Sequence, residues 1–235
     1  ALAQDYTQQW EQGNPEVLQL WRTMNGWVYE GFKETFEQLG IEYEKAYYES
    51  ECYELGKEMA LEGLSQNLFF KQPDGSVWVD LTDQNLDQKL LIRSDGTSVY
   101  ITQDMGVAEL RYNDYHPHQM IYVVGDEQIY HFKVLKLVLE KLGKPYANTI
   151  YHLYYGMVDL PEGKMKSREG KVVDADDLVA EMLQTAEEHT KELGKTEGMN
   201  PDEAHLLYRI LGIGALKYFM LRVNAQKRIL FNPKE

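Results

Sequence analysis

Two residues of this sequence, Tyr100 and Asp104, have types and a spacing that suit the binding of a cation. Short polar residues at 94–98 precede an apolar-periodic run, which is typical of the start of a helix. In a helix that begins near residue 97, residues four apart lie on one face. A phenol beside a carboxylate makes a small anionic, aromatic-walled site that fits a planar guanidinium better than an ammonium group. The alternative is a surface carboxylate beside a half-buried tyrosine.

A basic segment at 163–171 could bind phosphate. Its sequence, Gly-Lys-Met-Lys-Ser-Arg-Glu-Gly-Lys, holds four cations and one hydroxyl together with two glycines that could act as hinges. Such a mobile loop could close over a polyphosphate. It is not a P-loop, because the G-x-x-x-x-G-K-[ST] spacing is absent. The alternative is a solvated basic loop without a ligand.

The elements that would position these residues are two apolar strands, at 120–125 and about 149–155, separated by a helix at 127–142. Almost wholly apolar strands are typical of a parallel sheet buried on both faces, and a crossover of this length predicts a right-handed βαβ unit. The fold class is therefore α/β. In open α/β sheets ligands bind at the carboxyl ends of the strands, where residues 125–128 and 163–171 both fall.

Residues 1–93 have the pattern of a separate α+β module. We expect a helix from Pro15 to residue 39, closed by Gly40. The aromatic residues of this helix that we assign to the core are Trp21, Trp27 and Phe32. We then expect a strand at 41–48, a helix at 52–65, a hairpin at 68–81 and a strand at 89–93. The core positions predicted for the hairpin are Phe70, Val77, Val79 and Leu81. After the basic segment, two further helices are predicted, at 174–193 and 202–223.

The composition limits the class of protein. The 235 residues carry a net charge of −14, which opposes unspecific adhesion to nucleic acid or to an anionic membrane. With Cys52 as its single cysteine, the chain has no disulfide framework and no cysteine-based metal site. It opens without a signal peptide and has no apolar run near the roughly 18 residues of a membrane span, so we expect a cytoplasmic protein. Because it starts at Ala1 rather than Met, we expect a piece of a longer protein.

Several segments together resemble one known family. Residues 164–168, Lys-Met-Lys-Ser-Arg, resemble the Lys-Met-Ser-Lys-Ser loop of class I aminoacyl-tRNA synthetases. Residues 93–104 resemble the corresponding run of the arginyl-tRNA synthetases. So do Val123-Val124-Gly125 with Gln128 and His131-Phe132, and residues 170–173. The similarity runs, with gaps, over most of residues 15–235.

The resemblance implies a role for each matching residue. It assigns arginine binding to Tyr100, Asp104 and Gln128. It places Gly125 and Glu127 at the ribose of ATP, and His131, one helical turn after Gln128, is a further candidate for the ATP site, with packing or capping as the alternative. It assigns the ATP phosphates, with their Mg²⁺, to Lys164, Lys166 and Ser167. Two substrates and one partner are thereby implied: L-arginine, ATP and tRNA, with no membrane and no stable protein partner.

The reaction that the resemblance implies is ATP-dependent activation of arginine and its transfer to the 3′ end of tRNA. The sequence departs from the family in lacking the His-x-Gly-His signature of the first half of the fold. Its loop also leaves open which lysine takes the second-lysine role, for which we favour Lys166. We therefore expect a fragment that lacks full aminoacylation activity by itself. It would hold an insertion at 1–93, the second Rossmann-like half-fold at 94–173, and junction helices at 174–235 that lead to the anticodon-binding domain.

Three alternatives stay open at this point. A nucleotide-binding or regulatory paralogue could keep the half-fold without catalysis. Another class I aminoacyl-tRNA synthetase would share the basic loop while binding a different amino acid. An α/β interaction module with a basic loop and no ligand would belong to a different class of protein.

Overall fold

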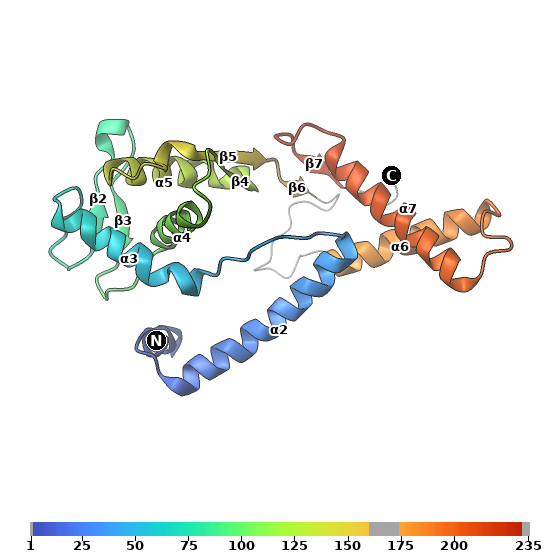
Figure 1. Ribbon diagram of the computed structural model, residues 1–235, viewed down its shortest axis with the longest axis horizontal. Helices are drawn as coiled ribbons and strands as arrows, with labels where there is room; N and C mark the ends of the chain where they lie inside the picture. Colours follow the sequence, from blue (N-terminus) through green and yellow to red (C-terminus); the bar gives the residue numbers. More distant parts are fainter. Residues whose placement is uncertain (1, 160–173, 232–235) are drawn as a thin grey trace. The chain divides into compact units, whose positions relative to one another are not determined.

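The computed structural model describes residues 2–159 and 174–231, which divide into two compact units (Figure 1). We call residues 2–44 with 174–222 the helical unit, and residues 45–159 with 223–231 the α/β unit. Residues 45–93 thus share a compact unit with residues 94–159. The boundaries predicted from the sequence, at 1–93, 94–173 and 174–235, describe where one segment is inserted into another. The two compact units do not test such boundaries, so these stay a prediction.

The helical unit begins with helices α1 (Leu2–Glu11) and α2 (Pro15–Leu39). Asn14 caps α2, because its side-chain oxygen accepts hydrogen bonds from the backbone N–H groups of Glu16 and Val17 at 3.0 and 3.2 Å. Gly40 ends the helix in the left-handed conformation, with φ of +61°. The helix predicted from Pro15 to residue 39 is confirmed.

The aromatic face of α2 is more exposed than the sequence predicted. Trp27 is 66% exposed and Phe32 is 55% exposed, so their assignment to the core is wrong for the described residues. Trp21 is half-buried, with its ring 5.5 Å from that of Trp10. A helical apolar period shows only that one face is apolar; a second element must supply the contact that buries it.

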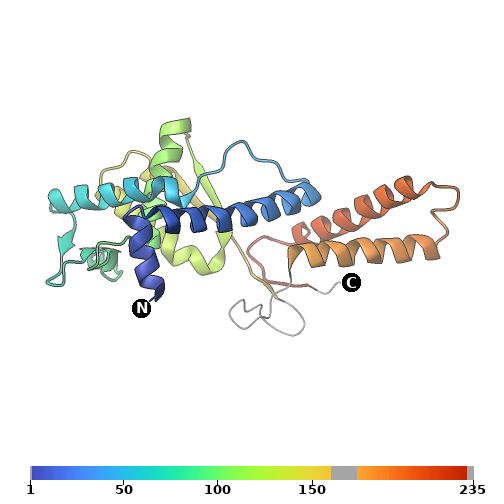
Figure 2. The ribbon, with the colours of Figure 1, turned by 90° about the horizontal axis from the view of Figure 1, so that it is seen from below.

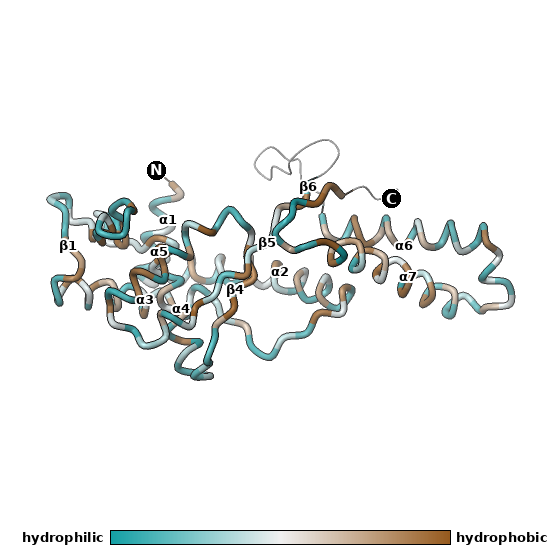
Figure 3. The backbone as a smooth tube through the Cα atoms, turned by 90° about the horizontal axis from the view of Figure 1, so that it is seen from above, coloured by the Kyte–Doolittle hydropathy of each residue, from teal (hydrophilic) through white to brown (hydrophobic). Residues whose placement is uncertain are grey.

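Helices α6 (Ala175–Glu192) and α7 (Pro201–Leu221) run side by side and complete the helical unit (Figure 2). Asp174 caps α6, and Asn200 forms a reciprocal capping box with Glu203 at the start of α7. Both predicted helices are confirmed. Figure 3 shows apolar stretches recurring along α7.

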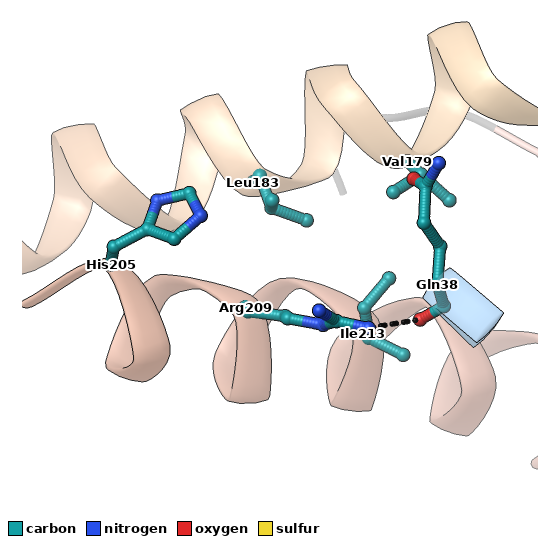
Figure 4. Close-up of a pocket in the computed structure, with 6 residues that line it drawn as sticks. All are labelled: Gln38, Val179, Leu183, His205, Arg209 and Ile213. Atoms are coloured by element: carbon teal, nitrogen blue, oxygen red, sulfur yellow. Dashed lines mark hydrogen bonds between the residues drawn. The ribbon is translucent and has the colours of Figure 1, made fainter. Parts of the chain in front are cut away.

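A small open pocket lies where the end of α2 meets α6 and α7 (Figure 4). Its lining residues are Gln38, Val179, Leu183, His205, Arg209 and Ile213. The guanidinium of Arg209 donates to the backbone oxygens of Glu37 and Gln38 at 3.1 and 3.4 Å. These are carbonyls of the last turn of α2, where partners within the helix run out. The oxygen of Glu37 also accepts from the N–H of the capping residue Gly40 at 3.2 Å. The pocket is therefore a structural junction in which Arg209 closes the end of α2.

The α/β unit opens with helix α3 (Glu49–Ser65) and a three-stranded antiparallel sheet. The strands, in the order β1-β2-β3, are β1 (Phe70–Lys71), β2 (Val77–Val79) and β3 (Lys89–Ile92), with the short helix η1 (Thr82–Gln84) between the last two. The predicted hairpin is confirmed, and Asp74 closes its turn by accepting hydrogen bonds from the N–H and hydroxyl of Ser76.

Two details of this region were predicted wrongly. Residues 41–48 contain no strand; Lys45 and Tyr47 are instead held by the carboxylate of Asp114. Val77, Val79 and Leu81 are buried as predicted, but Phe69 is the buried aromatic residue at 3% exposure, while Phe70 is half-buried. A shift of one residue exchanges the two faces of a strand, and a two-residue strand carries too few alternations to fix its register.

The second part of the α/β unit is the predicted strand–helix–strand arrangement. Helix α4 (Tyr100–Tyr115) leads to strand β4 (Met120–Gly125), the short helix η2 (Asp126–Gln128) and helix α5 (Ile129–Lys141). The short helix η3 (Ala147–Thr149) then precedes strand β5 (Ile150–Tyr155). Strands β4 and β5 pair in parallel, from Met120 opposite Ile150 to Gly125 opposite Tyr155, which confirms the predicted parallel pairing.

One face of the β4–β5 pair is buried and the other is open. The buried face joins α4, α5 and the antiparallel sheet in one core, whose fully buried members include Leu91, Met105, Leu135, Leu139 and Tyr146. The open face is also apolar. It consists of Ile121, Val123, Tyr151, Leu153 and Tyr155, each between 39% and 64% exposed. The expectation that both faces are buried is wrong for the described residues, because the two helices cover one side only.

A short parallel pairing that the sequence did not predict follows β5. Strand β6 (Val158–Asp159) pairs with β7 (Ile229–Leu230), and the N–H of Gly156 donates to the oxygen of Ala225 at 2.7 Å. A Cβ on Gly156 would lie 2.5 Å from the backbone of Lys227, so this close approach requires glycine. Across the described ranges, no helix combines the length and the apolar character that crossing a membrane requires.

Candidate functional site

The start of α4 is built by a compact turn at residues 93–98. Asp95 accepts hydrogen bonds from the N–H and hydroxyl of Thr97 at 3.0 and 2.7 Å. These hydrogen bonds hold the pKa of the Asp95 carboxyl below its ordinary value. Arg93 donates to the hydroxyl of Thr97 at 3.0 Å and to the oxygen of Ser98 at 2.5 Å. The short polar residues therefore form the turn before the helix, which begins at Tyr100, three residues later than predicted.

Helix α4 is fixed in place by one polar and one steric contact. The buried hydroxyl of Thr102 donates to the oxygen of Leu91 on β3 at 2.6 Å. On α4, Gly106 lies against the backbone of α3 so closely that a Cβ there would be 2.3 Å from the oxygen of Cys52. The facing residue, Gly56, would place a Cβ 1.9 Å from the oxygen of Thr102. Asp104 thus projects from a helix that is held by β3 through Thr102 and by α3 through the glycine contact.

Asp104 and His131 are the two predicted site residues that the structure brings into direct contact. The Oδ2 atom of Asp104 lies 2.6 Å from Nε2 of His131 on α5, and the two side chains are 38% and 25% exposed. Tyr100 lies one turn before Asp104 on α4 and is 75% exposed. Gln128 lies one turn before His131, at the N-terminus of α5. The contact that the structure shows among these four residues is therefore the one between Asp104 and His131.

Gly125 and Glu127 lie at the carboxyl end of β4, as predicted. Gly125 is the last residue of the strand, and Glu127 is exposed in η2. Between them lies Asp126, which the sequence placed in the expected ligand-binding segment 125–128 without assigning it a role. Its Oδ1 atom is buried, and among the described residues it has no hydrogen-bond partner. A buried acceptor without a partner suits a ligand that brings a hydroxyl or amine donor. Its position directly after the strand-ending glycine is the signal that could have identified it.

Asp104 is one of the charges that act on the buried thiol of Cys52. Burial raises the pKa of the Cys52 thiol to about 11, and the negative charges of Glu49, Asp104 and Glu51 add to this increase. An ionised carboxylate such as that of Asp104 attracts a cation, because opposite charges attract. Asp104 therefore suits a positively charged ligand.

We expect Cys52 in the folded chain to react slowly with thiol reagents. A pKa of about 11 against the ordinary 9.0 lowers the thiolate fraction at pH 8 by about 100-fold, and the residue is 0% exposed. Alkylation by iodoacetamide at pH 8 should therefore be at least about 100-fold slower in buffer than in 6 M guanidinium chloride. Equal rates in the two solvents would contradict the burial of this thiol.

The predicted phosphate-binding residues Lys164, Lys166 and Ser167 lie outside the described residues. In the described part of the chain, no group of three or more histidine, cysteine, aspartate or glutamate side chains could hold a metal ion. Mg²⁺ that accompanies ATP is usually bound by phosphate oxygens, waters and one or two carboxylates. Asp126 and Glu127, in η2 directly after β4, would be able to contribute such carboxylates.

The class of protein follows from the comparison with known families. The family described as "tRNA synthetases class I (R), catalytic domain" matches residues 1–232 of the chain. The chain therefore belongs to the class I tRNA synthetases of the arginine (R) family, as the sequence motifs indicated.

The chain is similar to proteins named arginine–tRNA ligase. It is 62% identical to the one from Amoebophilus asiaticus and 58% identical to the one from Bacteroides fragilis, over 99% of this chain in both comparisons. It spans 39% of the length of each of these relatives.

Two solved structures resemble the fold. The arginyl-tRNA synthetase of Plasmodium falciparum matches 97% of this chain with a TM-score of 0.80 at 19% identity, and the match covers 38% of that chain. The Thermus thermophilus arginyl-tRNA synthetase also matches 97% of this chain, with a TM-score of 0.68 at 20% identity, and the match covers 45% of that chain. At these identities the likeness concerns the fold.

Proposed function

We propose that the complete protein carrying this chain is an ATP-dependent arginine–tRNA ligase, and that this chain supplies its arginine pocket. The observation that carries the proposal is the Asp104 carboxylate, which projects from helix α4 and contacts His131 on α5 at 2.6 Å. An ionised carboxylate binds guanidinium by charge-assisted hydrogen bonds, two of which can form in parallel. Family membership and the names of the relatives support arginine as the amino acid.

The proposed reaction has two steps. The carboxylate of arginine attacks the α-phosphate of ATP, which forms the mixed anhydride and releases pyrophosphate; a hydroxyl at the 3′ end of tRNA then attacks the activated carbonyl and releases AMP. Neither step needs a nucleophile from the protein, so catalysis is positioning together with stabilisation of the phosphate charge. Mg²⁺ bound with the ATP phosphates supplies part of that charge stabilisation.

The side chains divide between the two substrates. Asp104 binds the guanidinium of arginine, and Tyr100 and Gln128 bind the rest of that substrate. Gly125 allows the ribose of ATP to approach the end of β4, where Glu127 can accept hydrogen bonds from its hydroxyls. Lys164, Lys166 and Ser167 contact the phosphates. Lysine and citrulline forfeit the paired hydrogen bonds to Asp104 and leave polar groups unsatisfied, which excludes them from the site.

We further infer that β4 and β5 belong to a larger Rossmann-like parallel sheet. Parallel sheets have both faces covered, whereas this pair exposes Ile121 and Val123 on an apolar face. Since the chain spans 39% of its relatives' length, the complete protein has ample polypeptide to cover this face and to extend the sheet.

A charged substitution on the open face tests this inference. In the isolated chain, Val123→Glu should change the free energy of unfolding by no more than about 0.5 kcal/mol, because Val123 is 64% exposed. In the complete protein the same change should cost several kcal/mol, roughly 3 or more, because it buries an unpaired charge. The measurement is urea unfolding of both proteins. Equal effects in the two would mean that the face stays open.

The function itself is tested by charging of tRNA. The complete protein should attach arginine to tRNA in the presence of ATP and Mg²⁺, and it should not attach lysine or citrulline at comparable concentrations. If arginine is not attached, or if another amino acid is attached faster, the proposal is wrong.

A further inference from the structure

His131 contacts the carboxylate that we assign to the arginine side chain. Its Nε2 atom lies 2.6 Å from Oδ2 of Asp104, so one oxygen of the carboxylate is engaged by a residue of α5. The second oxygen, Oδ1, takes no part in this contact. A carboxylate has about four acceptor positions on its two oxygens, so Asp104 can hold His131 and a ligand at the same time.

The imidazole of His131 is itself held in place. Its ring packs edge-on against Phe132, with centroids 5.7 Å apart. Phe132 in turn stacks on His152 of β5 at 4.4 Å and lies 5.0 Å from Tyr122 of β4. Nε2 of His152 lies 3.0 Å from the backbone oxygen of Val124. The first turn of α5 is thereby fixed to both strands of the parallel pair, and His131 meets Asp104 from a rigid element.

We infer that His131 is a positioning residue of the arginine pocket: its Nε2–H donates to Oδ2 of Asp104 and holds the carboxylate with Oδ1 available to the substrate guanidinium. This inference rests on the proposed function. The sequence suggested His131 as a candidate for the ATP site. The inference places it in the arginine pocket instead. A half-exposed aspartate without such a partner samples several rotamers, and fixing one of them in advance removes part of the cost of binding.

A role in positioning differs from a role in competition. If His131 occupied Asp104 only until arginine displaced it, removing the imidazole would strengthen arginine binding. If His131 holds the carboxylate for the substrate, removing it weakens arginine binding and leaves ATP binding unchanged. Removal of the imidazole would therefore lower the dissociation constant for arginine if His131 competes, and raise it if His131 positions Asp104.

Two variants of the complete protein separate the hydrogen bond from the shape of the ring. His131→Phe keeps a planar ring and loses the donor; it should raise the KM for arginine about tenfold, with the KM for ATP and kcat within about twofold. His131→Gln keeps a donor at a similar place and should keep the KM for arginine within about threefold of the original. Lys133→Gln, at an exposed position of α5, is the matched control and should change neither KM.

A double variant shows whether His131 acts through Asp104, because the effect of the two substitutions together is then smaller than the sum of their single effects. In an Asp104→Asn background, His131→Phe should add less than about twofold to the KM for arginine, because its partner is already lost. The inference is overturned by an increased KM for ATP, by a decreased or unchanged KM for arginine, or by full additivity in the double variant.

A direct measurement of arginine binding tests this inference separately from the proposed function. Calorimetry of the complete protein with arginine reports the dissociation constant without any reaction. If the unsubstituted protein binds arginine but charges no tRNA, the proposed function fails, while a tenfold weaker dissociation constant for His131→Phe still supports the positioning role. If His131→Phe does not fold, His131→Asn, whose shorter side chain cannot bring a donor to Oδ2 of Asp104, replaces it in the single and the double variant; it should also weaken arginine binding, and unchanged binding would overturn the inference.

Discussion

Asp104→Asn in the complete protein is expected to raise the KM for arginine by about 5- to 150-fold, which corresponds to a loss of roughly 1–3 kcal/mol of binding free energy. The amide keeps the size of the side chain but removes its charge and one acceptor oxygen. It therefore loses the paired, charge-assisted hydrogen bonds to guanidinium. Steady-state charging at varied arginine concentrations, together with calorimetry, measures the effect.

The same helix offers a matched control. Asp114, at the other end of α4, pairs with Lys45 and accepts a hydrogen bond from the hydroxyl of Tyr47 at 2.6 Å. Asp114→Asn removes the same charge and should leave the KM for arginine within about twofold, since surface ion pairs contribute little. Unchanged arginine affinity in Asp104→Asn, or an equal loss in both variants, would refute the assignment of Asp104.

The second large effect is expected from Gly106→Ala, which should destabilise the chain by about 3 kcal/mol or more. The new Cβ would lie 2.3 Å from the oxygen of Cys52 and 2.9 Å from the nitrogen of Gly56. Both are backbone atoms of α3, so relief requires α3 and α4 to move apart. That movement opens the core around Met105 and displaces Asp104.

Urea unfolding of the isolated chain measures this cost. Gly31→Ala in α2 is the control, because a Cβ at that position meets nothing within 4 Å. As a helical glycine replaced by alanine, it should stabilise its helix by about 0.5–1 kcal/mol. If Gly106→Ala were as harmless as Gly31→Ala, the close crossing of α3 and α4 would be wrong.

The secondary structure was largely readable from the sequence because its signals are local. Asn14 before Pro15 and Gly40 after Leu39 bound α2, where capping groups satisfy the ends of the helix. The apolar run that ends at Gly125 predicted both the strand and its parallel pairing. These signals depend on neighbours within a few residues, so they need no knowledge of the tertiary structure.

Burial was predicted less well, because it depends on elements elsewhere. Trp27 and Val123 have the residue types of a core, yet both are exposed in the described residues. Periodicity identified the apolar face in each case, but it could not identify what covers that face. The two-residue pairing of β6 with β7 carries no sequence pattern at all, since it joins residues about 70 positions apart.

The contact within the candidate site could not be predicted from the sequence, and the roles of the site residues stay a prediction. The spacing of Tyr100 and Asp104 followed from helical geometry alone. The contact between Asp104 and His131 joins two helices 27 residues apart in sequence, and only the packing of α4 on α5 reveals it. For the same reason, the sequence suggested ATP for His131, whereas its contact with Asp104 is the ground on which we infer a role in the arginine pocket.

The most direct test of the account is the structure of the complete protein with arginine bound. We predict a guanidinium nitrogen at about 2.7–3.2 Å from Oδ1 of Asp104, with His131 still on Oδ2. A guanidinium bound away from α4, without contact to Asp104, would contradict the account.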